Sequence, residues 1–400
     1  MATEKLYWGD PFATTFEAAA RTSALGGAPS VVLDRTLFYP EAGGQLADAG
    51  TLVVAGRTLE VRDVQLGDDG TIHHLVDATP WLADLPDGTA ARGAIDAARR
   101  RDHMAAHTAQ HALSRALIDV GRAETVSARL GATSCTIDVS GALDEATAAR
   151  AEDLVNSVVT SDVVVRALFP TPGELARMPL RRAPKVDRDV RVIEIDGFDL
   201  SPCGGTHCTR TGQIGQVRVV GLERYKGGWR VTFHAGRRAL DDARRKEAVL
   251  AGLARDFTCG VLDVGQAIGK LRAELKARTD ALSTARGELA VLVAERALAA
   301  HPPGEGATHI VVVRERDDLE MLRTLAGQLA SRDDVVAFCA APDASGALSI
   351  VVQRGALAGF DCGAWLKRVA SEHGGRGGGR PERAEGRLPA SVSLEVLARG

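Results

Sequence analysis

The sequence lacks a strong charge of either sign. Its 49 lysine and arginine residues nearly balance its 52 aspartate and glutamate residues, and the formal net charge is −3. This balance does not indicate a strongly basic nucleic-acid-binding protein. Any contact with RNA therefore has to use local groups of basic residues.

Long hydrophobic runs and paired cysteines are absent as well. No segment approaches the roughly 18 apolar residues of a membrane-spanning helix. The opening residues MATEKLYWGDPF lack the basic and then apolar stretch of a signal peptide. The 6 cysteines are scattered without a pairing pattern, which argues against a disulfide framework. We therefore expect a cytoplasmic protein with no membrane partner, in which clustered cysteine and histidine residues bind a metal.

The composition is that of a globular chain with several cores. The 400 residues are 45% hydrophobic and 25% charged, which suits more than one hydrophobic core. Changes in sequence pattern predict an α+β, multidomain protein. The expected parts are a small N-terminal β-barrel over 1–95, an α+β domain over 96–236, a helical segment over 237–301 and a small α/β domain over 302–400.

Individual elements follow from periodicity and turn residues. Short apolar runs between glycine turns predict barrel strands over 30–37, 51–64 and 71–76. Helices are expected over 99–119, from the capping residue Asp144 to about 161, and over 237–257 and 264–300. The second domain is expected to contain strands over 135–139, 163–169, 190–195, 216–222 and 229–234.

The helix expected over 264–300 has a seven-residue leucine pattern. Apolar residues recur at Ile268, Leu275, Leu282 and Leu289, which is typical of a coiled-coil seam. The other seam position is mixed, with Leu271, Arg278, Ala285 and Leu292. We therefore expect a helical hairpin packed on itself, with a homodimer through this segment as the alternative.

Two short motifs have the spacing of metal ligands. HTAQH places His107 and His111 four residues apart, on one face of a predicted helix. CGGTH places Cys203 and His207 in a loop that two glycines allow to fold tightly. Three imidazoles and a thiolate form a four-ligand set that suits Zn²⁺.

Each motif alone is weak, since a single HxxxH is more often a surface or core pair. Together they predict a zinc site. A metalloprotease HExxH site is excluded because Thr108 stands where the general base would be. If all four residues bind at once, the coordination is closed and the zinc can be structural, whereas a catalytic role needs one ligand to yield.

The motifs together resemble a known family. HTAQHALS over 107–114 and CGGTHCTRTGQIG over 203–215 resemble the zinc-binding editing domain of alanyl-tRNA synthetases. The resemblance is closest to their freestanding relatives, the alanyl-tRNA editing proteins of the AlaX type, long form. DRTLFYPEAGGQLADAG over 34–50 resembles the glycine-rich motif of the barrel domain. GGRGGGRPERAEG over 374–386 resembles the signature of the synthetases' C-terminal domain, which helps to hold tRNA.

The resemblance implies a domain arrangement and an activity. It makes 96–236 a zinc-binding editing domain, 237–301 a coiled-coil linker and 302–400 a tRNA-binding domain. Because the chain opens on the barrel, we expect an editing protein without an aminoacylation domain, acting in trans. The implied reaction is hydrolysis of the ester that joins serine, or also glycine, to alanine tRNA.

Two further residues receive roles from the resemblance. An alanine pocket cannot strongly reject serine by size, so a second, hydrolytic site has to separate the two. Thr36 matches the family position that reads the serine hydroxyl. Gln110 lies on the ligand helix, where it either positions the reacting group or water, or is an ordinary capping polar residue. Cys208, beside a ligand, is either an alternative ligand or a small buried residue.

Three groups of basic residues are candidate phosphate contacts. They are Arg99 to Arg101, then Arg181 and Arg182 with Lys185, and finally Arg376, Arg380 and Arg383. Taken singly, such groups are more often solvated surface. Arg376 and Arg380 are the better candidates, because the neighbouring Gly377 and Gly378 let a phosphate backbone come close.

Two functions from different classes remain open. The first is a trans-editing hydrolase, and the alternative is a non-catalytic, zinc-containing protein that binds tRNA or another RNA. They differ in whether Thr36 and Gln110 line a pocket beside the zinc. A zinc hydrolase of another small ester or amide would leave the C-terminal glycine-arginine segment unexplained.

Overall fold

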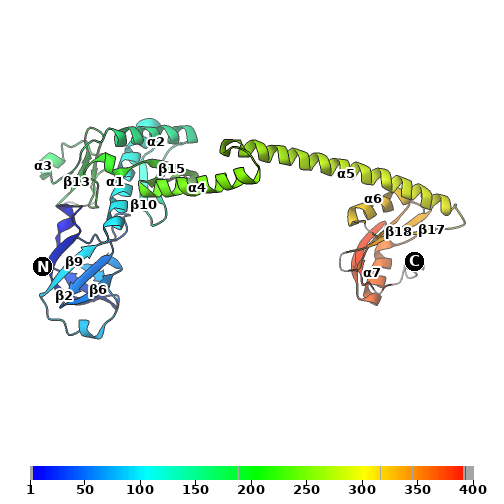
Figure 1. Cartoon of the computed structure of the whole chain (residues 1–400), viewed down its shortest axis with the longest axis horizontal. Helices are drawn as coiled ribbons and strands as arrows, with labels where there is room; N and C mark the ends of the chain where they lie inside the picture. The colour runs from blue at the N-terminus through cyan, green and yellow to red at the C-terminus, as the bar shows by residue number, and fades with distance from the viewer. Residues whose placement is uncertain are drawn as a thin grey trace. The chain divides into compact units, whose positions relative to one another are not determined.

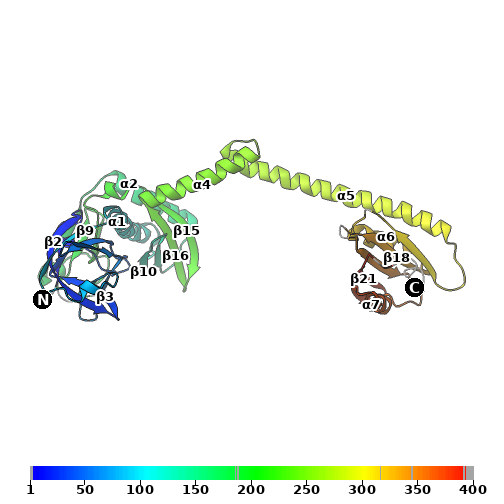
Figure 2. The same cartoon turned by 60° about the horizontal axis from the view of Figure 1, so that its bottom comes forward.

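The computed structural model describes residues 3–184, 186, 189–315, 317–343, 346–390 and 392. Lys185 lies outside these described residues. The chain divides into two compact units, Met1–Ala251 and Gly252–Gly400 (Figures 1 and 2). No helix among the described residues is both long and apolar enough to cross a membrane.

A seven-stranded sheet forms the N-terminal part of the first unit. Its strand order is β6-β5-β9-β2-β3-β8-β7, and every neighbouring pair is antiparallel. The strands are β2 (Thr15–Leu25), β3 (Ala28–Leu33), β5 (Gly50–Val54), β6 (Arg57–Val61), β7 (Asp63–Leu66), β8 (Ile72–Leu75) and β9 (Thr89–Ile95). Arg62 alone separates the edge strands β6 and β7, so one bent segment of chain forms both edges. The predicted barrel is therefore present as a curled sheet, and no ladder pairs these two edge strands.

The strand expected over 51–64 is wrong in its extent, because the chain turns within it. Ala55 and Gly56 have positive φ angles of 49° and 74° and reverse the chain between β5 and β6. The sequence pattern also fails to predict β2 and β9. Both strands are rich in alanine, a residue with low strand propensity.

Helix α1 (Ala97–Gly121) forms the centre of the rest of this unit. Asp96 caps it by accepting hydrogen bonds from the backbone N–H groups of Ala98 and Arg99. It packs on α2 (Glu145–Thr160), which Asp144 caps as predicted. A four-stranded sheet, β10-β11-β16-β15, lies against α1 and α2. Its strands are β10 (Thr125–Leu130), β11 (Cys135–Val139), β15 (Val217–Tyr225) and β16 (Gly228–Ala235).

A small three-stranded sheet completes the unit and leads into the CGGTH loop. It has the order β12-β13-β14, with β12 (Val165–Leu168), β13 (Val192–Ile195) and β14 (Asp199–Pro202). The short helix α3 (Pro172–Leu175) follows β12, and α4 (Arg237–Asp256) follows β16. The short strand β1 (Glu4–Lys5) pairs in parallel with β4 (Arg35–Thr36). Since β14 ends at Pro202, the loop ligands begin directly after an ordered strand.

The second unit is a three-layer arrangement of helices around one sheet. The strand order is β17-β18-β19-β21-β20, with β17 and β18 parallel and the other pairs antiparallel. Its elements are α5 (Val264–Ala300), β17 (Thr308–Val313), α6 (Leu319–Leu329), β18 (Val335–Pro342), β19 (Leu348–Arg354), α7 (Cys362–His373), β20 (Arg376–Arg380) and β21 (Arg383–Leu388). Alternate residues of β18 face two cores: Phe338 packs with α7, and Cys339 packs with α5 and α6.

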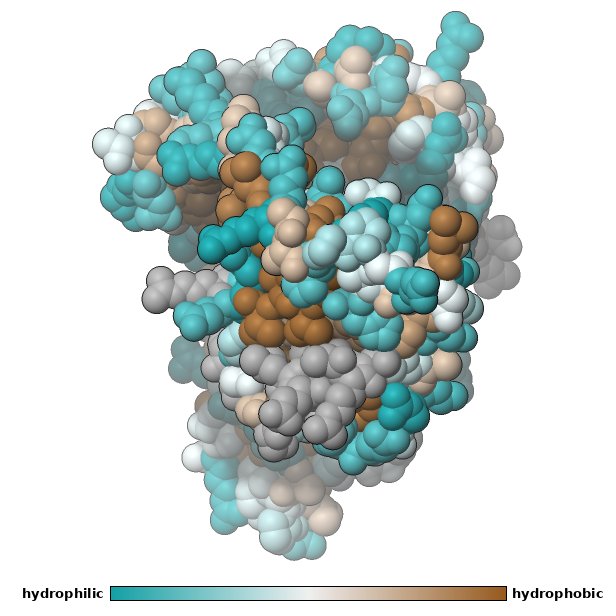
Figure 3. Space-filling model, turned by 90° about the vertical axis from the view of Figure 1, so that its right-hand side faces the viewer, coloured by the Kyte–Doolittle hydropathy of each residue, from teal (hydrophilic) through white to brown (hydrophobic). Residues whose placement is uncertain are grey.

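The helical hairpin expected for 237–301 stays a prediction, because it would join α4 to α5, and these helices lie mainly in different units. The seam leucines Leu275 and Leu282 are 64% and 51% exposed. The buried residues near the end of α5 are instead Ala290 and Ala294, which contact α6 and the sheet. Small residues let these elements approach closely, so the alanine face rather than the leucine seam is used. Figure 3 shows one view of the surface, which is largely hydrophilic, with hydrophobic residues grouped in the middle of the view and a few elsewhere.

Candidate metal centre

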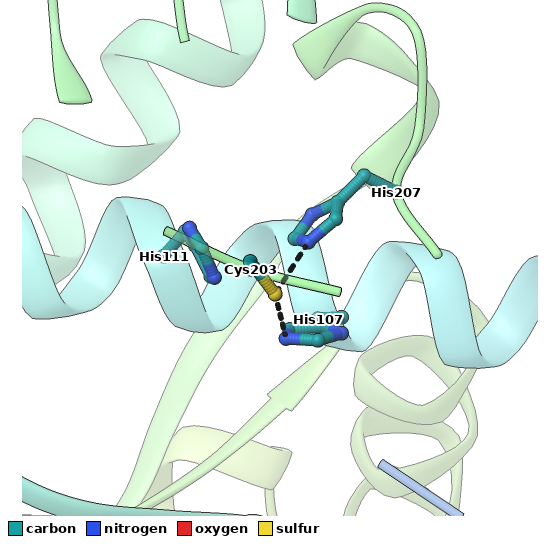
Figure 4. A group of neighbouring side chains, drawn as sticks. All are labelled: His107, His111, Cys203 and His207. Atoms are coloured by element: carbon teal, nitrogen blue, oxygen red, sulfur yellow. Dashed lines mark hydrogen bonds between the residues drawn. The ribbon is translucent and has the colours of Figure 1, made fainter. Parts of the chain in front are cut away.

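Four side chains from distant parts of the sequence meet inside the first unit. His107, His111, Cys203 and His207 each offer one ligand atom, and these atoms all lie within 4.8 Å of one another (Figure 4). Cys203 Sγ lies 3.3 Å from His107 Nε2 and 3.4 Å from His207 Nε2. The four residues predicted from spacing are therefore brought together.

Local sequence explains how the loop reaches the helix. Gly205 approaches α1 so closely that a Cβ built on it would lie 2.2 Å from His107 Cε1. Any side chain at this position would therefore displace the imidazole. Arg191, which is buried, donates hydrogen bonds to the carbonyl oxygens of Cys203 (3.0 Å) and Gly205 (2.7 Å). Trp8 Nε1 donates to the carbonyl oxygen of Gly204 at 2.9 Å.

Outer partners orient two of the three imidazoles. His107 Nδ1 lies 2.7 Å from Gln45 Oε1, an amide oxygen that also accepts from the backbone N–H of Thr206. His207 Nδ1 lies 3.2 Å from Thr108 Oγ1, whose own proton goes to the carbonyl oxygen of Met104. Both Nδ1 atoms must therefore donate, which leaves the Nε2 lone pairs directed at Cys203.

His111 is held less firmly. Its Nδ1 lies 3.5 Å from Asp199 Oδ2, which is within ion-pair distance. Neither of these two atoms has a hydrogen-bond partner among the described residues. Its Nε2 is buried and likewise has no partner there. Asp199 itself is anchored by Arg181, whose Nε donates to Oδ1 at 2.8 Å.

These observations test whether the residues fit a metal ion. A buried imidazole nitrogen without a partner is costly unless a ligand meets it. Burial opposes ionisation of Cys203, but His107, His207 and His111 outweigh it and hold the pKa of this thiol well below its usual value. Burial lowers the pKa of both His107 and His207. Burial also opposes protonation of His111, but the nearby Cys203 and Asp199 outweigh it and raise the pKa of this imidazole. The Cys203 thiolate and the neutral imidazoles of His107 and His207, each with an outer partner on Nδ1, are in the form in which such residues bind zinc.

Thr36 and Gln110 lie apart from this hydrogen-bond network. His74 Nδ1 donates to the carbonyl oxygen of Val31, so its Nε2 accepts a hydrogen bond from the hydroxyl of Thr36 at 2.8 Å. Thr36 Oγ1 also accepts from the backbone N–H of Phe38. Gln110 Nε2 donates to Ser114 Oγ on the same helix. Neither residue has a hydrogen bond to a ligand among the described residues, so both assigned roles stay predictions.

Sequence reasoning missed the residues that support the ligands. Gln45 is fully buried, and besides contacting His107 its Nε2 donates to Thr206 Oγ1 at 2.9 Å. Its position in the glycine-rich motif 34–50 was a usable signal. Asp199 and Arg191 lie in no motif that marks them, and Thr108, although part of HTAQH, was used only to exclude a metalloprotease site. Cys208 lies in the hydrophobic core, outside the ligand group, where burial raises its pKa to about 11.

Two arginines proposed as phosphate contacts are internal. Arg100 is 1% exposed, and its Nε lies 3.1 Å from Asp48 Oδ2. Arg181 is buried against Asp199. Each neutralises a buried carboxylate, so neither can reach RNA. Arg376 and Arg380 are exposed on β20 and have no carboxylate partner among the described residues.

Gly377 and Gly378, two of the three glycines of β20, differ in their surroundings. A Cβ on Gly377 would meet the side chain of Leu366 at 2.9 Å, so this glycine is required for packing against α7. A Cβ on Gly378 would have nothing within 4 Å. Only Gly378 thus offers the open approach that was expected of both.

Three families match parts of the sequence. Residues 190–232, which include Cys203 and His207, match the threonyl and alanyl tRNA synthetase second additional domain. Residues 13–99 match the class II (A) tRNA synthetases, and residues 306–399 match the DHHA1 domain. The alanine–tRNA ligase of Halorubrum lacusprofundi is 32% identical over 98% of this chain. The chain resembles the alanyl-tRNA synthetase family.

Two further alanine–tRNA ligases have a similar sequence identity to this chain. The alanine–tRNA ligases of Haloquadratum walsbyi and Saccharopolyspora erythraea are each 30% identical, over 98% and 95% of the chain. The chain spans less than half of these relatives, covering 43% and 44% of their length. The C-Ala domain of Aquifex aeolicus alanyl-tRNA synthetase is 22% identical over 25% of this chain and 91% of that domain, with a TM-score of 0.23. This low score adds nothing to the family match.

Proposed function

We propose that His107, His111, Cys203 and His207 hold a zinc ion and that the chain hydrolyses mischarged aminoacyl-tRNA. The proposed substrate is the ester of serine, or of glycine, with alanine tRNA. One observation carries the proposal: two imidazoles have their Nδ1 atoms engaged outward and their Nε2 lone pairs aimed at a shared thiolate. The match to a second additional domain of threonyl and alanyl tRNA synthetases supports the choice of substrate.

The chain's own residues would hold the site rigid around the substrate. Gln45 and Thr108 fix two of the imidazoles, and Arg191 fixes the backbone of the CGGTH loop. Zinc bound here would supply a Lewis acid that orients the aminoacyl end or polarises its ester carbonyl. His111 has the weakest outer contact of the three histidines, so it is the side chain that we expect to move when substrate enters.

Discrimination between serine and alanine is proposed to rest on Thr36. Its hydroxyl donates to His74 and accepts from Phe38, which leaves one oxygen lone pair free. A serine hydroxyl that reached this lone pair would gain a hydrogen bond in a buried site. Alanine would leave that lone pair without a partner, and the absence of this hydrogen bond would add to the difference in size between the two side chains.

Contact with the tRNA body is proposed for β20. Arg376 and Arg380 are exposed beside Gly378, so guanidinium groups and an open backbone lie together. Such a surface suits phosphate contacts, which position RNA without reading its sequence.

A non-catalytic, zinc-containing tRNA-binding protein is the second candidate. It is favoured by the closed character of the site, since four ligand atoms lie within 4.8 Å of one another. A tetrahedral set of four protein ligands is typical of structural zinc, whereas catalytic zinc keeps one position open.

Deacylation of Ser-tRNA(Ala) and Ala-tRNA(Ala) distinguishes the two candidates. The purified chain is compared with a Cys203→Ala, His207→Ala variant and with Cys208→Ala, a neighbouring buried cysteine outside the ligand group. Rapid release of serine but not alanine, lost in the first variant and kept in the second, supports the hydrolase. Stable Ser-tRNA(Ala) that still binds tightly supports the binding protein.

A further inference from the structure

A cavity of about 410 Å³ opens beside the first turns of α1. It is separate from the four ligand residues and lies wholly within the first unit. Its lining comes from α1, the turn before β11 and the start of α4, and consists of Ala98, Arg99, Asp102, His103, Ala132 and Arg238. The volume is that of a small-ligand site.

The lining arginines have unused donors. Arg99 Nε donates to the carbonyl oxygen of Ala47, and Arg238 Nη1 donates to that of Gly131. Neither forms an ion pair with any carboxylate in the described part of the chain. The remaining N–H groups of two guanidinium forks are therefore available. Asp102 is the single acidic residue of the lining, so its net charge stays positive.

His103 supplies a second, independent sign of a ligand. It is 3% exposed, lines the cavity, and its Nδ1 has no hydrogen-bond partner among the described residues. Buried polar atoms without partners are rare in folded proteins. Burial, followed by the charges of Arg99 and Arg238, lowers the pKa of His103 to about 3, in keeping with an electropositive cavity.

The cavity lies next to the metal centre. His103 and His107 are four residues apart on α1, so they project from one face and are separated by about 6 Å along the helix axis. A bound RNA strand whose end reached His107 would therefore pass within reach of the cavity. The helix N-terminus contributes little, because Asp96 already caps it.

We propose that this cavity binds a phosphate group, namely a backbone phosphodiester of the RNA strand whose end enters the metal centre. Two arginine forks match phosphate geometry, and a neutral imidazole adds one donor. The identity of the strand as tRNA rests on the proposed function. A free phosphate ion is the other source of the same chemistry.

The test measures binding of uncharged tRNA(Ala) to the full chain between 50 and 200 mM KCl. The variants are Arg99→Gln with Arg238→Gln, and Ala132→Phe, which fills the cavity at an exposed position without changing charge. Arg92→Gln is the matched control, because Arg92 is exposed on β9, belongs to none of the three candidate phosphate-contact groups and is not part of the lining. Inorganic phosphate is titrated separately into each protein by calorimetry.

Both cavity variants should bind tRNA about tenfold more weakly or worse. For one lost phosphate contact, the salt slope should become shallower by about 0.7 to 0.9 in log–log units. The Arg92→Gln control should change neither the affinity for tRNA nor the salt slope. Unchanged binding in both cavity variants, or equal losses in the control, overturns the proposal.

Two further outcomes distinguish a free phosphate ion from an RNA phosphate, and distinguish this inference from the proposed hydrolase activity. Loss of inorganic phosphate binding with unchanged tRNA binding means a free phosphate site and overturns the RNA assignment. Because uncharged tRNA is used, the result does not depend on hydrolysis. A chain that deacylates nothing but shows the cavity-dependent slope keeps this inference and loses the hydrolase.

Discussion

Gln45 joins the barrel motif to the metal centre, and replacing it tests how the site is held. In Gln45→Leu, His107 Nδ1 loses its acceptor at 2.7 Å and the backbone N–H of Thr206 loses its acceptor at 3.1 Å. Thr206 Oγ1 also loses its donor. The leucine fills a similar volume, so the change removes hydrogen bonds rather than packing.

The magnitude follows from the buried donors left unpaired. Two such donors, at about 1–3 kcal/mol each, lower the free energy of unfolding of the first unit by about 2–6 kcal/mol. Loss of an outer partner of a metal ligand typically weakens metal affinity about 10- to 100-fold. Gln45→Glu keeps an oxygen facing His107 and Thr206, so its loss of affinity should be smaller.

Zinc affinity is measured by competition with a chelator for the wild-type chain and both variants. Gln65→Leu is the control, because Gln65 is only partly buried and donates to Asp63, away from the ligands. Gln45→Leu should bind zinc at least tenfold more weakly than Gln65→Leu. If the two agree within twofold in well-folded protein, His107 is oriented without Gln45 and the reasoning about outer partners is refuted.

Three other predictions concern the loop, the barrel and the long helix. Gly205→Ala should reduce zinc affinity at least tenfold, because the added Cβ would displace His107. Gly204→Ala is the control and should leave zinc affinity unchanged, because its Cβ would have nothing within 4 Å. Equal losses of zinc affinity in the two variants would contradict this prediction. Burial lowers the pKa of His74 to about 4 from 6.5, so unfolding takes up a proton between these values. The contribution of His74 to the free energy of unfolding is therefore complete above pH 6.5, and about 3 kcal/mol of it is lost as the pH falls to 4. Hydrogen exchange in β3 should show this dependence on pH, and His74→Asn should reduce it. If the exposed seam leucines mediate the proposed homodimer, Leu275→Gln with Leu282→Gln should give monomers in sedimentation, and an unchanged mass would rule out this seam.

The sequence predicted the elements whose pattern is strong and local. The bounds of α5 agree with the expected 264–300, because a long segment with helical periodicity and no proline is expected to form one continuous helix. The grouping of His107, His111, Cys203 and His207 was predictable because each motif has the spacing of metal ligands, and the helix fixes that spacing for the first two. Asp144 was predictable as a cap because its side chain acts on its own helix.

The missed features depend on contacts distant in sequence. Gln45 meets Thr206 across 161 residues, and its place in the motif over 34–50 marks Gln45 without indicating this partner. Arg100 looks like part of a basic surface group, yet Asp48 draws it into the interior. Heptad spacing likewise describes a leucine seam on α5, but it does not say that Ala290 and Ala294 meet the neighbouring layer of the second unit.

A metal ion held by the four candidate ligands would also affect chain entropy. His107 and Cys203 meet although 96 residues separate them. An ion held by both would close a loop of that length, much as a disulfide does. In the loop-closure treatment of cross-links, a loop of about 100 residues is worth between 4 and 5 kcal/mol. Such a metal cross-link is opened by a chelator and not by a reducing agent. It would therefore keep the helix and the CGGTH loop together under reducing conditions, in which a disulfide would not last.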